Sequence, residues 1–400
     1  MLGAVRATGL PPHPHCVRGL ILTRGSRLRG SLVQPVVIPR ADVERTAIGG
    51  LRSFLNIEHV TDLLCQKHSV SIKDRHFVRL QAESIRYCLQ QALEYRDAAL
   101  ASVFSRPTLV YYFVMSAALC EILFKRTGEF RLAKLRERHG HHGLDLLIDT
   151  PGALRGEVTM DDLSVQHRDT GTFPVWHETA LSPGVFGTLT EIVGQGRTSG
   201  LREMAPPSVL TGLPARISLR ELASCCPTIY SEAADLGIEL RVARATLEYT
   251  RNLDAKTNTI DLIIHPTIPN VLDEIWKHIT FSPRCVEHVQ PKDFRAGGGF
   301  SLTFPDGVDY VNVKMPLSHM LEQRFCLLTT EEIALNEFGI YYLASYIEGM
   351  FARYYPEFWT RALDANNQTF QVIDTLMGSA LARAPLLLLG ALRERYYISD

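Results

Sequence analysis

The chain has 400 residues, of which 46% are hydrophobic and 21% are charged, and its formal net charge is −1. This length exceeds what one hydrophobic core usually supports, so the sequence predicts two domains or one helical domain with a large insertion. The near-zero charge excludes wholesale binding of polyanions, although a local basic patch could still bind nucleic acid. The eight cysteines include no CxxC pair. This argues against a zinc ribbon or a secreted disulfide framework and favours buried thiols in a reducing cytoplasm.

The first forty residues differ in composition from the rest of the chain. They contain six arginines and five prolines but no acidic residue. Organelle transit peptides share this bias, whereas proline-rich sequence without hydrophobic periodicity rarely folds. We therefore expect residues 1–45 to be a disordered leader, or an upstream extension that results from an early start codon.

Helical signals dominate residues 51–150. Residues 74–103 contain no glycine or proline, and their apolar positions recur mostly at spacings of three, four or seven. Pro107 stands where the first turn of a new helix tolerates proline. The sequence therefore predicts two antiparallel helices joined by a short turn. Tyr111 and Tyr112 are expected in the core, with one hydroxyl in reach of Glu121 or of the histidines that follow.

Residues 151–320 have a mixed character. In their first half glycine and proline are frequent and periodicity is absent, apart from a short capped helix at residues 217–222. Alternation of apolar and polar residues then predicts strands. These strands are residues 238–242, 259–264, 300–304 and 310–314, of which the last two form a hairpin.

Residues 331–364 and 369–397 again predict helices, which we expect to pack on the first helical part. The longest apolar run, Pro385–Leu392, is shorter than the roughly eighteen residues that a membrane span needs, so we expect a buried helix and no membrane contact. The predicted fold class is α+β and mainly α, with a helical core and a mixed insertion that contains a small β-sheet. The expected parts are a leader (1–45), an N-terminal helical part (51–150), the insertion (151–320) and a C-terminal helical part (321–400).

Several short segments occur in a recognisable order and spacing. They are Arg106–Tyr112, His142–Leu144, Gly171–Pro174, Ile217–Leu222, Tyr346–Trp359 and Ala384–Leu386. Together they resemble the YaaC-like protein family over roughly residues 54–397. The resemblance implies an architecture. It implies little chemistry, because this bacterial family has no firmly assigned activity.

Residues 74–144 are also similar to HEPN domains, which contain a pair of long antiparallel helices. That superfamily includes metal-independent ribonucleases marked by an arginine, four to six intervening residues and a histidine, and two such motifs usually face each other across a dimer. Here Arg136 precedes His141 and His142 at this spacing. The similarity implies Arg136, His141 and His142 as catalytic residues, RNA as the substrate and a homodimer. Glu137 departs from the motif, in which Asn, Asp or His usually follows the arginine.

The three residues suit RNA cleavage without a metal. Histidine can accept the proton of a 2′-hydroxyl near neutral pH, and arginine can stabilise the negative charge that develops on the phosphate. The spacing alone carries little information, because two other arginine–histidine pairs in the chain repeat it. Only the position after the helix with the paired tyrosines favours Arg136.

Two other interpretations of this segment stay open. In the first, His142 and Gly143 end a helix and Arg136 is solvated. In the second, His139, His141 and His142 bind a metal, although adjacent histidines diverge and no nearby cysteine or carboxylate completes a tetrahedral set. We expect no metal and no cofactor.

Tyr354, Tyr355 and Trp359 form an aromatic cluster around Pro356. Exposed rings of this kind can stack on nucleobases, so the cluster is a candidate contact surface. Since Pro356 marks a helix break, the rings could instead hold the C-terminal helices on the core.

Two functional hypotheses follow. The first is a cytoplasmic HEPN-like enzyme directed at RNA or nucleotides, such as an endoribonuclease, that acts as a homodimer in stress or phage defence. The second is a non-catalytic helical interaction or scaffold protein with a protein partner. The placement of Arg136 relative to His141 and His142 discriminates between them.

Overall fold

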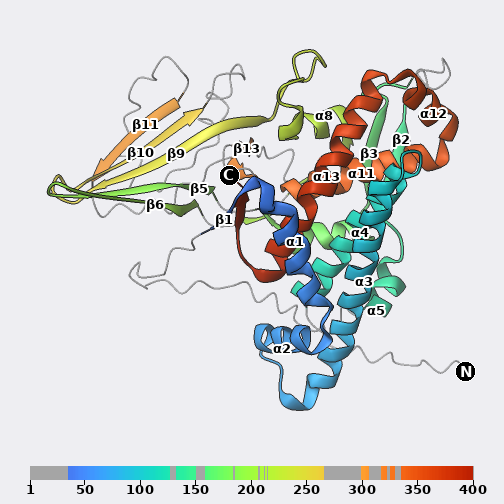
Figure 1. Cartoon of the computed structure of the whole chain (residues 1–400), viewed down its shortest axis with the longest axis horizontal. Helices are drawn as coiled ribbons and strands as arrows, with labels where there is room; N and C mark the ends of the chain where they lie inside the picture. Colours follow the sequence, from blue (N-terminus) through green and yellow to red (C-terminus); the bar gives the residue numbers. More distant parts are fainter. Residues whose placement is uncertain are drawn as a thin grey trace, which may run out of the picture. The chain divides into compact units, whose positions relative to one another are not determined.

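Helices make up most of the structure, and small β-sheets are inserted in the middle of the chain, as the sequence predicts. Figure 1 shows the computed structural model. All described elements belong to one compact unit, residues 34–400. The structure describes residues 35–126, 132–149, 158–182, 185–205, 208–210, 212–213, 215–264, 299–305, 317–321, 325–328 and 335–399.

The folded part begins ahead of the boundary expected at residue 45. Strand β1 (Val36–Ile38) precedes helix α1 (Val43–Arg52) and pairs in parallel with β14 (Tyr397–Ser399), the last strand of the chain. Ile38 is buried in the core, which explains why this strand is part of the fold. Residues 1–34, where most of the expected leader falls, lie outside the described residues.

The first helical part contains the predicted pair of long helices. The absence of glycine and proline lets one helix run for 27 residues, and Pro107 lies in the first turn of the next. The helices of this part are α2 (Ile57–His68), α3 (Arg75–Ala101), α4 (Arg106–Lys125) and α5 (Leu132–His139). The 3₁₀ turns near them are η1 (Arg40–Asp42), η2 (Ser53–Leu55) and η3 (Ile72–Asp74).

Helices α3 and α4 pack against each other in antiparallel orientation. Near the turn that joins them, the ring centroids of Tyr95 and Tyr112 are 5.5 Å apart. Further from the turn, the Cys120 thiol donates to the Ile85 carbonyl over 3.6 Å. Helix α4 is buried on several sides because α11, α13 and α7 also contact it. The predicted antiparallel pair is confirmed.

The C-terminal helices pack on the first helical part, as expected. Helix α11 contacts α4 and α13, while α13 also contacts α1 (Figure 1). At Gly349 of α11, an added Cβ would lie 2.8 Å from the Cβ of Tyr111, so glycine permits the close approach of α4. The helices are α11 (Glu337–Tyr354), α12 (Pro356–Ala365) and α13 (Gln368–Arg393).

The helix predicted for residues 331–364 is divided in two. Helix α11 ends at Tyr354 and α12 begins at Pro356, because a residue that precedes proline disfavours the helical conformation. Tyr355 accordingly leaves the helical region, with φ −130° and ψ 53°.

Two of the long helices, α4 and α13, are apolar and long enough to cross a membrane by length and composition. The sequence expectation, which counted uninterrupted apolar runs, missed this property. In both helices 72% of the most apolar window is buried within the protein. Such burial is typical of the core helices of a folded domain, which pass the same test.

A small antiparallel sheet lies beside α11. Its order is β2-β3-β8, and both α11 and α8 contact it. Ser218 and Glu221 form the capping box that starts α8, so the predicted capped helix is confirmed. The elements of this part are β2 (Leu144–Ile148), β3 (Leu163–His167), α7 (Thr172–Thr179), β8 (Arg216–Ser218), α8 (Leu219–Ser224) and η4 (Pro227–Ile229).

A larger sheet has the strand order β11-β10-β9-β13-β12, and β5 pairs with both β6 and β9. Strands β4 (Leu181–Ser182) and β7 (Ser208–Val209) form a separate short pair. The strands of the larger sheet are β5 (Val185–Val193), β6 (Gly196–Ala205), β9 (Val242–Asn252), β10 (Thr257–Ile264), β11 (Gly299–Pro305), β12 (Leu317–His319) and β13 (Phe325–Leu328).

The strand predictions are right in part. Strands β10 and β11 confirm two of them, and the expected strand at residues 310–314 lies outside the described residues. The strand expected at residues 238–242 is wrong except at Val242, where β9 begins. Its backbone bonds to the preceding helical region, since the Arg241 amide donates to the Ser224 carbonyl at 2.8 Å. The β5–β6 hairpin was not predicted, because frequent glycine masks its alternation.

Candidate functional site

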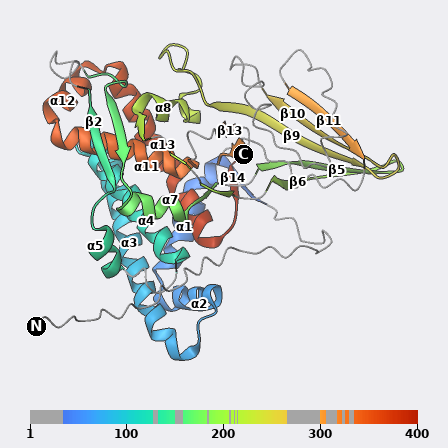
Figure 2. The same ribbon diagram turned by 180° about the vertical axis from the view of Figure 1, so that it is seen from behind.

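Two chain reversals meet beside the end of α5. Gly143 and Gly171 both have positive φ, 76° and 120°, a region that side chains other than glycine rarely adopt. An added Cβ on Gly143 would lie 2.5 Å from Cδ of Pro174, so the two reversals are in close contact. The Phe173 amide donates to the His142 carbonyl at 3.0 Å and joins them. Figure 2 shows α7, which follows this junction, beside α4.

His139 and His141 stabilise this junction of the two reversals. Nδ1 of His139 accepts from the Gly171 amide at 3.2 Å, and Nδ1 of His141 accepts from the Gly143 amide at 3.2 Å. Nε2 of His141 also lies 3.3 Å from the Thr170 hydroxyl. The lone pairs on both Nδ1 atoms are therefore used by the backbone, which disfavours a metal bound there.

His142 packs instead into an aromatic cluster. Its Nδ1 lies 2.5 Å from the Tyr111 hydroxyl, and its ring centroid lies 5.3 Å from that of Tyr111 and 5.9 Å from that of Tyr346. Burial lowers the pKa of His142 below 6.5, and the positive charge of Arg353 lowers it further. His142 is therefore neutral at pH 7 while part of its ring remains exposed.

The two tyrosines hold the His142 ring. Tyr111 is fully buried on α4, and burial raises its pKa far above the ordinary value, so its hydroxyl stays protonated. The Tyr346 hydroxyl donates to the Leu144 carbonyl at 2.7 Å and ties α11 to β2. Burial raises the pKa of Tyr346 to about 12, with a further contribution from the charge of Asp145. Neither phenol ionises near neutral pH.

Arg353 supplies a positive charge next to this cluster. It lies in the last turn of α11, and its Nη1 donates to the Tyr112 hydroxyl at 2.9 Å. The centre of its guanidinium is 5.2 Å from the ring centroid of Tyr354, which is 60% exposed. Within the part of the chain that the structure describes, Arg353 forms no ion pair, so its charge is available to an anion.

Asp145 and Arg168 form a neutral pair at the edge of the same site. Two nitrogen–oxygen contacts of 2.6 and 2.5 Å join them. The hydrogen bond from Arg168 holds the pKa of Asp145 below its ordinary value. Because this pair is internally compensated, the uncompensated positive charge near His142 comes from Arg353.

The family model of the YaaC-like proteins matches residues 52–392. The chain belongs to the YaaC-like family. No curated protein and no solved structure matches the chain. The family match agrees with the resemblance inferred from the sequence. It covers α3, α4, α11 and the contact of the reversals at Gly143 and Gly171, called here the glycine junction.

In this YaaC-like protein, the three predicted catalytic residues are not brought together. Arg136 is exposed on α5, and among the described contacts none joins it to His141 or His142. Its charge instead contributes to the lowered pKa of Cys88 on α3, behind the larger effect of the hydrogen bond from Cys120. His141 belongs to the glycine junction, and His142 alone enters the aromatic cluster.

The three aromatic residues predicted as a contact surface have different environments. Trp359 is 1% exposed, and its indole N–H donates to the Phe104 carbonyl at 3.0 Å, so this ring packs in the core and is not part of a surface. Tyr355 is half-buried, with its ring 6.4 Å from that of Phe358. Tyr354 is the member of the cluster that stays exposed, beside Arg353.

Sequence reasoning missed Arg353 and Tyr346 as partners of His142. Their spacing of seven residues places them on the same face of a helix, two turns apart, and both lie in one of the segments that resemble the family. This spacing was a usable signal, but nothing local shows that the face meets His142. The expectation that a hydroxyl of the tyrosine pair reaches the histidines is confirmed by Tyr111.

Proposed function

We propose that this YaaC-like protein is a HEPN-like, metal-independent enzyme directed at RNA, with His142 as its acid–base residue. One observation carries the proposal. The His142 ring is neutral, partly exposed and fixed through Nδ1 by Tyr111, beside Arg353, which forms no ion pair with a described residue. A fixed neutral imidazole next to a cation is what transfer of a 2′-hydroxyl proton near a phosphate requires.

The geometry supports the following roles. In the tautomer with the proton on Nδ1, that N–H donates to the Tyr111 oxygen and leaves Nε2 as the base. Nε2 of His142 accepts the 2′-hydroxyl proton and the 2′-oxygen forms a bond to phosphorus. The bond from phosphorus to the 5′-oxygen breaks, and that oxygen takes up a proton from water. The products are a 2′,3′-cyclic phosphate and a 5′-hydroxyl. Arg353 binds the phosphate oxygens and Tyr354 offers a ring on which a base can stack.

This assignment replaces the arginine of the sequence motif. Arg353 on α11, and not Arg136 on α5, is the cation whose charge reaches His142. One chain supplies a single His142, whereas HEPN ribonucleases usually combine two motifs across a dimer. The proposal therefore includes a homodimer, in the cytoplasm, with a role in stress or phage defence.

The test uses the full chain and a short fluorescent RNA in the presence of EDTA. We expect the parent to cleave the RNA and to leave the corresponding DNA intact, since DNA lacks the 2′-hydroxyl. His142→Ala should lower the rate by about 100-fold or more, as loss of a general base does. Arg353→Ala should also lower the rate, whereas Arg136→Ala, a matched exposed arginine, should not.

A second candidate function is a non-catalytic scaffold, which the use of His139 and His141 by the backbone favours. Intact RNA with the parent protein, together with equal growth of cells that express the parent and His142→Ala, would reject the enzyme and leave this second function. Loss of cleavage in Arg136→Ala but not in Arg353→Ala would reject the assignment of the cation.

A further inference from the structure

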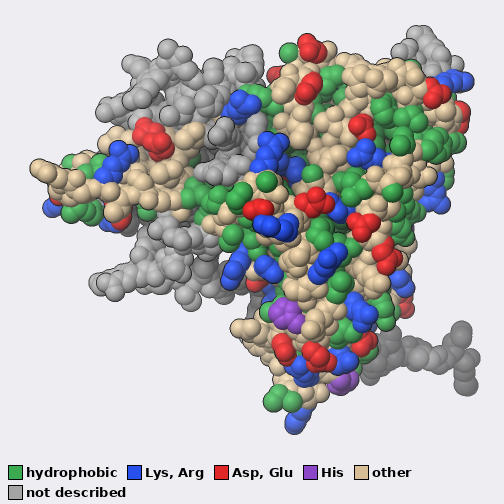
Figure 3. Space-filling model, viewed as in Figure 1, with side chains coloured by type: hydrophobic (Ala, Val, Ile, Leu, Met, Phe, Trp, Pro, Cys, Tyr) green, Lys and Arg blue, Asp and Glu red, His purple; other side chains and the backbone are tan. Residues whose placement is uncertain are grey.

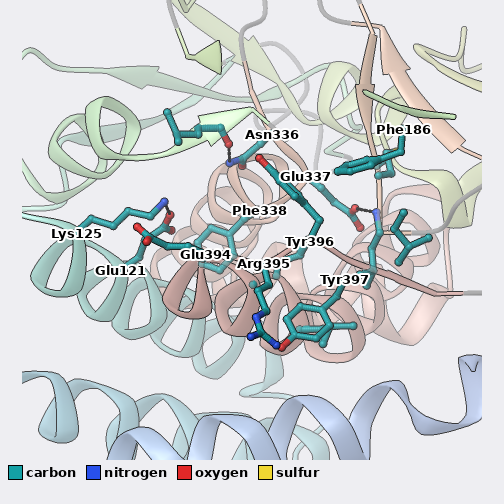
Figure 4. Close-up of a pocket in the computed structure, with 18 residues that line it drawn as sticks. Glu121, Lys125, Phe186, Asn336, Glu337, Phe338, Glu394, Arg395, Tyr396 and Tyr397 are labelled. Carbon is teal, nitrogen blue, oxygen red and sulfur yellow. Dashed lines mark hydrogen bonds and ion pairs between the residues drawn. The ribbon is translucent and has the colours of Figure 1, made fainter. Parts of the chain in front are cut away.

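A cavity of about 360 Å³ lies away from His142, where α4, α11 and α13 meet the last residues of the chain. Figure 4 shows the side chains that line it. This volume is in the range of small-molecule sites, which are mostly apolar with a few polar groups. Its apolar wall includes Leu181, Phe186, Met320, Leu321, Phe338 and Leu386.

Two of the carboxylates that line the cavity are neutralised by ion pairs deep in the structure. Glu121 is 3% exposed and accepts from Lys125 at 2.6 Å (Figure 4). It also accepts from the Trp176 indole at 2.7 Å. Glu337 is likewise buried and pairs with Arg383 of α13. Neither carboxylate is available to attract a cationic ligand.

The remaining charges lie in the loop that follows α13. Glu394 pairs with Lys67 of α2. Arg395 is exposed, lines the cavity, and forms no ion pair with any residue that the structure describes. Each carboxylate that lines the cavity is therefore paired with a cation. The charge of Arg395 gives the cavity one uncompensated positive charge.

The position of Arg395 is fixed by the backbone. Its amide donates to the Gly390 carbonyl at 3.1 Å, and an added Cβ on Gly390 would lie 2.9 Å from the Arg395 carbonyl oxygen. Two residues later Tyr397 enters strand β14 and pairs with Val36 of β1. The backbone that carries Arg395 is therefore held at both sides of this loop.

We propose that this cavity binds a small anionic amphiphile, a molecule with an apolar body and one carboxylate or phosphate group. The apolar body would occupy the space between Phe186, Phe338 and Leu386, and the anionic group would pair with Arg395. This inference does not depend on the proposed RNA-directed function, because the two sites share no residue.

The test is a binding titration of the full chain with three probes of equal chain length: laurate, dodecylammonium and dodecanol. Binding is followed by calorimetry and by tryptophan fluorescence. Trp176 is a suitable reporter, since it bonds to Glu121 and its ring lies 5.4 Å from that of Phe338. We expect one laurate per chain, bound more tightly than dodecanol, and no saturable binding of dodecylammonium.

Two variants locate the site. Arg395→Ala should weaken laurate about two- to fivefold, the effect of a solvent-exposed ion pair, and leave dodecanol unchanged. Ala391→Trp should abolish binding of both probes, because Ala391 lines the cavity and a large ring would fill it. Arg86→Ala, an exposed arginine of α3, is the matched control and should bind laurate like the parent.

The outcomes that overturn the inference are distinct. Absence of laurate binding in the parent, or unchanged binding in a folded Ala391→Trp variant, rejects the site. Equal affinity of the parent for laurate and dodecylammonium, or equal weakening by Arg395→Ala and Arg86→Ala, rejects the anionic class of ligand. If Ala391→Trp does not fold, the Arg395→Ala variant and the comparison of the three probes still test whether the cavity binds an anionic amphiphile. Loss of RNA cleavage would affect none of these results.

Discussion

The Tyr111 hydroxyl lies 2.5 Å from Nδ1 of His142, and this contact joins the buried helix α4 to the turn before β2. It fixes the one histidine of the His-rich segment that reaches the aromatic cluster. Acidic and basic side chains are interspersed over the face of the molecule seen in Figure 3, so no broad basic surface marks that face. The contact of Tyr111 with His142 therefore locates the candidate site, whereas the charge on this face does not.

Removing the Tyr111 hydroxyl should cost stability. In Tyr111→Phe the partly buried Nδ1 of His142 loses its partner, and we expect the free energy of unfolding to fall by about 1–3 kcal/mol. Denaturant unfolding measures this change. Tyr112→Phe is the control, because its hydroxyl partner Arg353 is exposed and the expected loss is below about 0.5 kcal/mol. Equal losses in the two variants would contradict a special role for the Tyr111 contact.

His142 should make stability depend on pH. Its pKa in the folded protein is lowered from 6.5, so the unfolded chain binds the proton more readily. Its contribution is complete above about pH 6.5 and is lost as the pH falls through the folded pKa. His142→Gln should flatten this decline, measured as the melting temperature between pH 5 and 7.5. The slope should persist in part, since burial also lowers the pKa of His68 and His139. An unchanged slope would argue against a half-buried, neutral His142.

Glu348 should make stability depend on pH in the direction opposite to that of His142. It is 1% exposed on α11, and burial raises its pKa well above 4.5, with a smaller effect of Asp374. The folded protein keeps this proton while the unfolded chain loses it above about pH 4.5, so stability falls as the pH rises toward the folded pKa. Glu348→Gln should therefore raise the melting temperature at pH 8 and change it little at pH 4. The exposed Glu357→Gln is the control, and a lower melting temperature of Glu348→Gln at pH 8 would oppose this account.

Removing one member of the Glu337–Arg383 ion pair should lower the free energy of unfolding. Glu337 is 3% exposed, and it also accepts from the Leu321 amide at 2.7 Å and from the Tyr341 hydroxyl at 3.1 Å. In Glu337→Ala the buried Arg383 keeps its charge without this partner, so we expect a loss of about 3–5 kcal/mol. The double variant with Arg383→Met should recover much of that loss in a double-mutant cycle. Additive losses would show that the two side chains do not act as a pair.

Gly171 should not tolerate a side chain. In Gly171→Ala the positive φ alone costs about 1–3 kcal/mol, and the added Cβ would also lie 2.9 Å from Nδ1 of His141. Gly49→Ala in α1 is the matched control. Apart from the helix's own backbone and the two chain neighbours, no described residue has an atom within 4 Å of its added Cβ. Alanine should therefore stabilise this helix by about 0.5–1 kcal/mol. Chemical denaturation of both variants should give changes of opposite sign.

Local sequence was sufficient for the long helices and for some of the strands. The boundaries of α3 and α4 follow from the lack of glycine and proline in one and from Pro107 in the other. Alternation predicted β10 and β11 but failed at residues 238–241, where Ile238 is buried although none of the described strands pairs with it. A burial pattern of period two reports which side chains face the core, and a strand also needs a partner that the local sequence does not reveal.

The sequence by itself determined the family, the mainly helical class and the segment that carries His142. Only the tertiary structure decided which cation serves that histidine. Arg136 is six residues from His142, but its charge acts on Cys88 of α3. Arg353 is more than two hundred residues away and acts on His142 across the contact of α11 with α4. Helix propensity and periodicity depend on neighbours along the chain, whereas the pKa of His142 depends on burial and charge from elements that meet only when the helices pack.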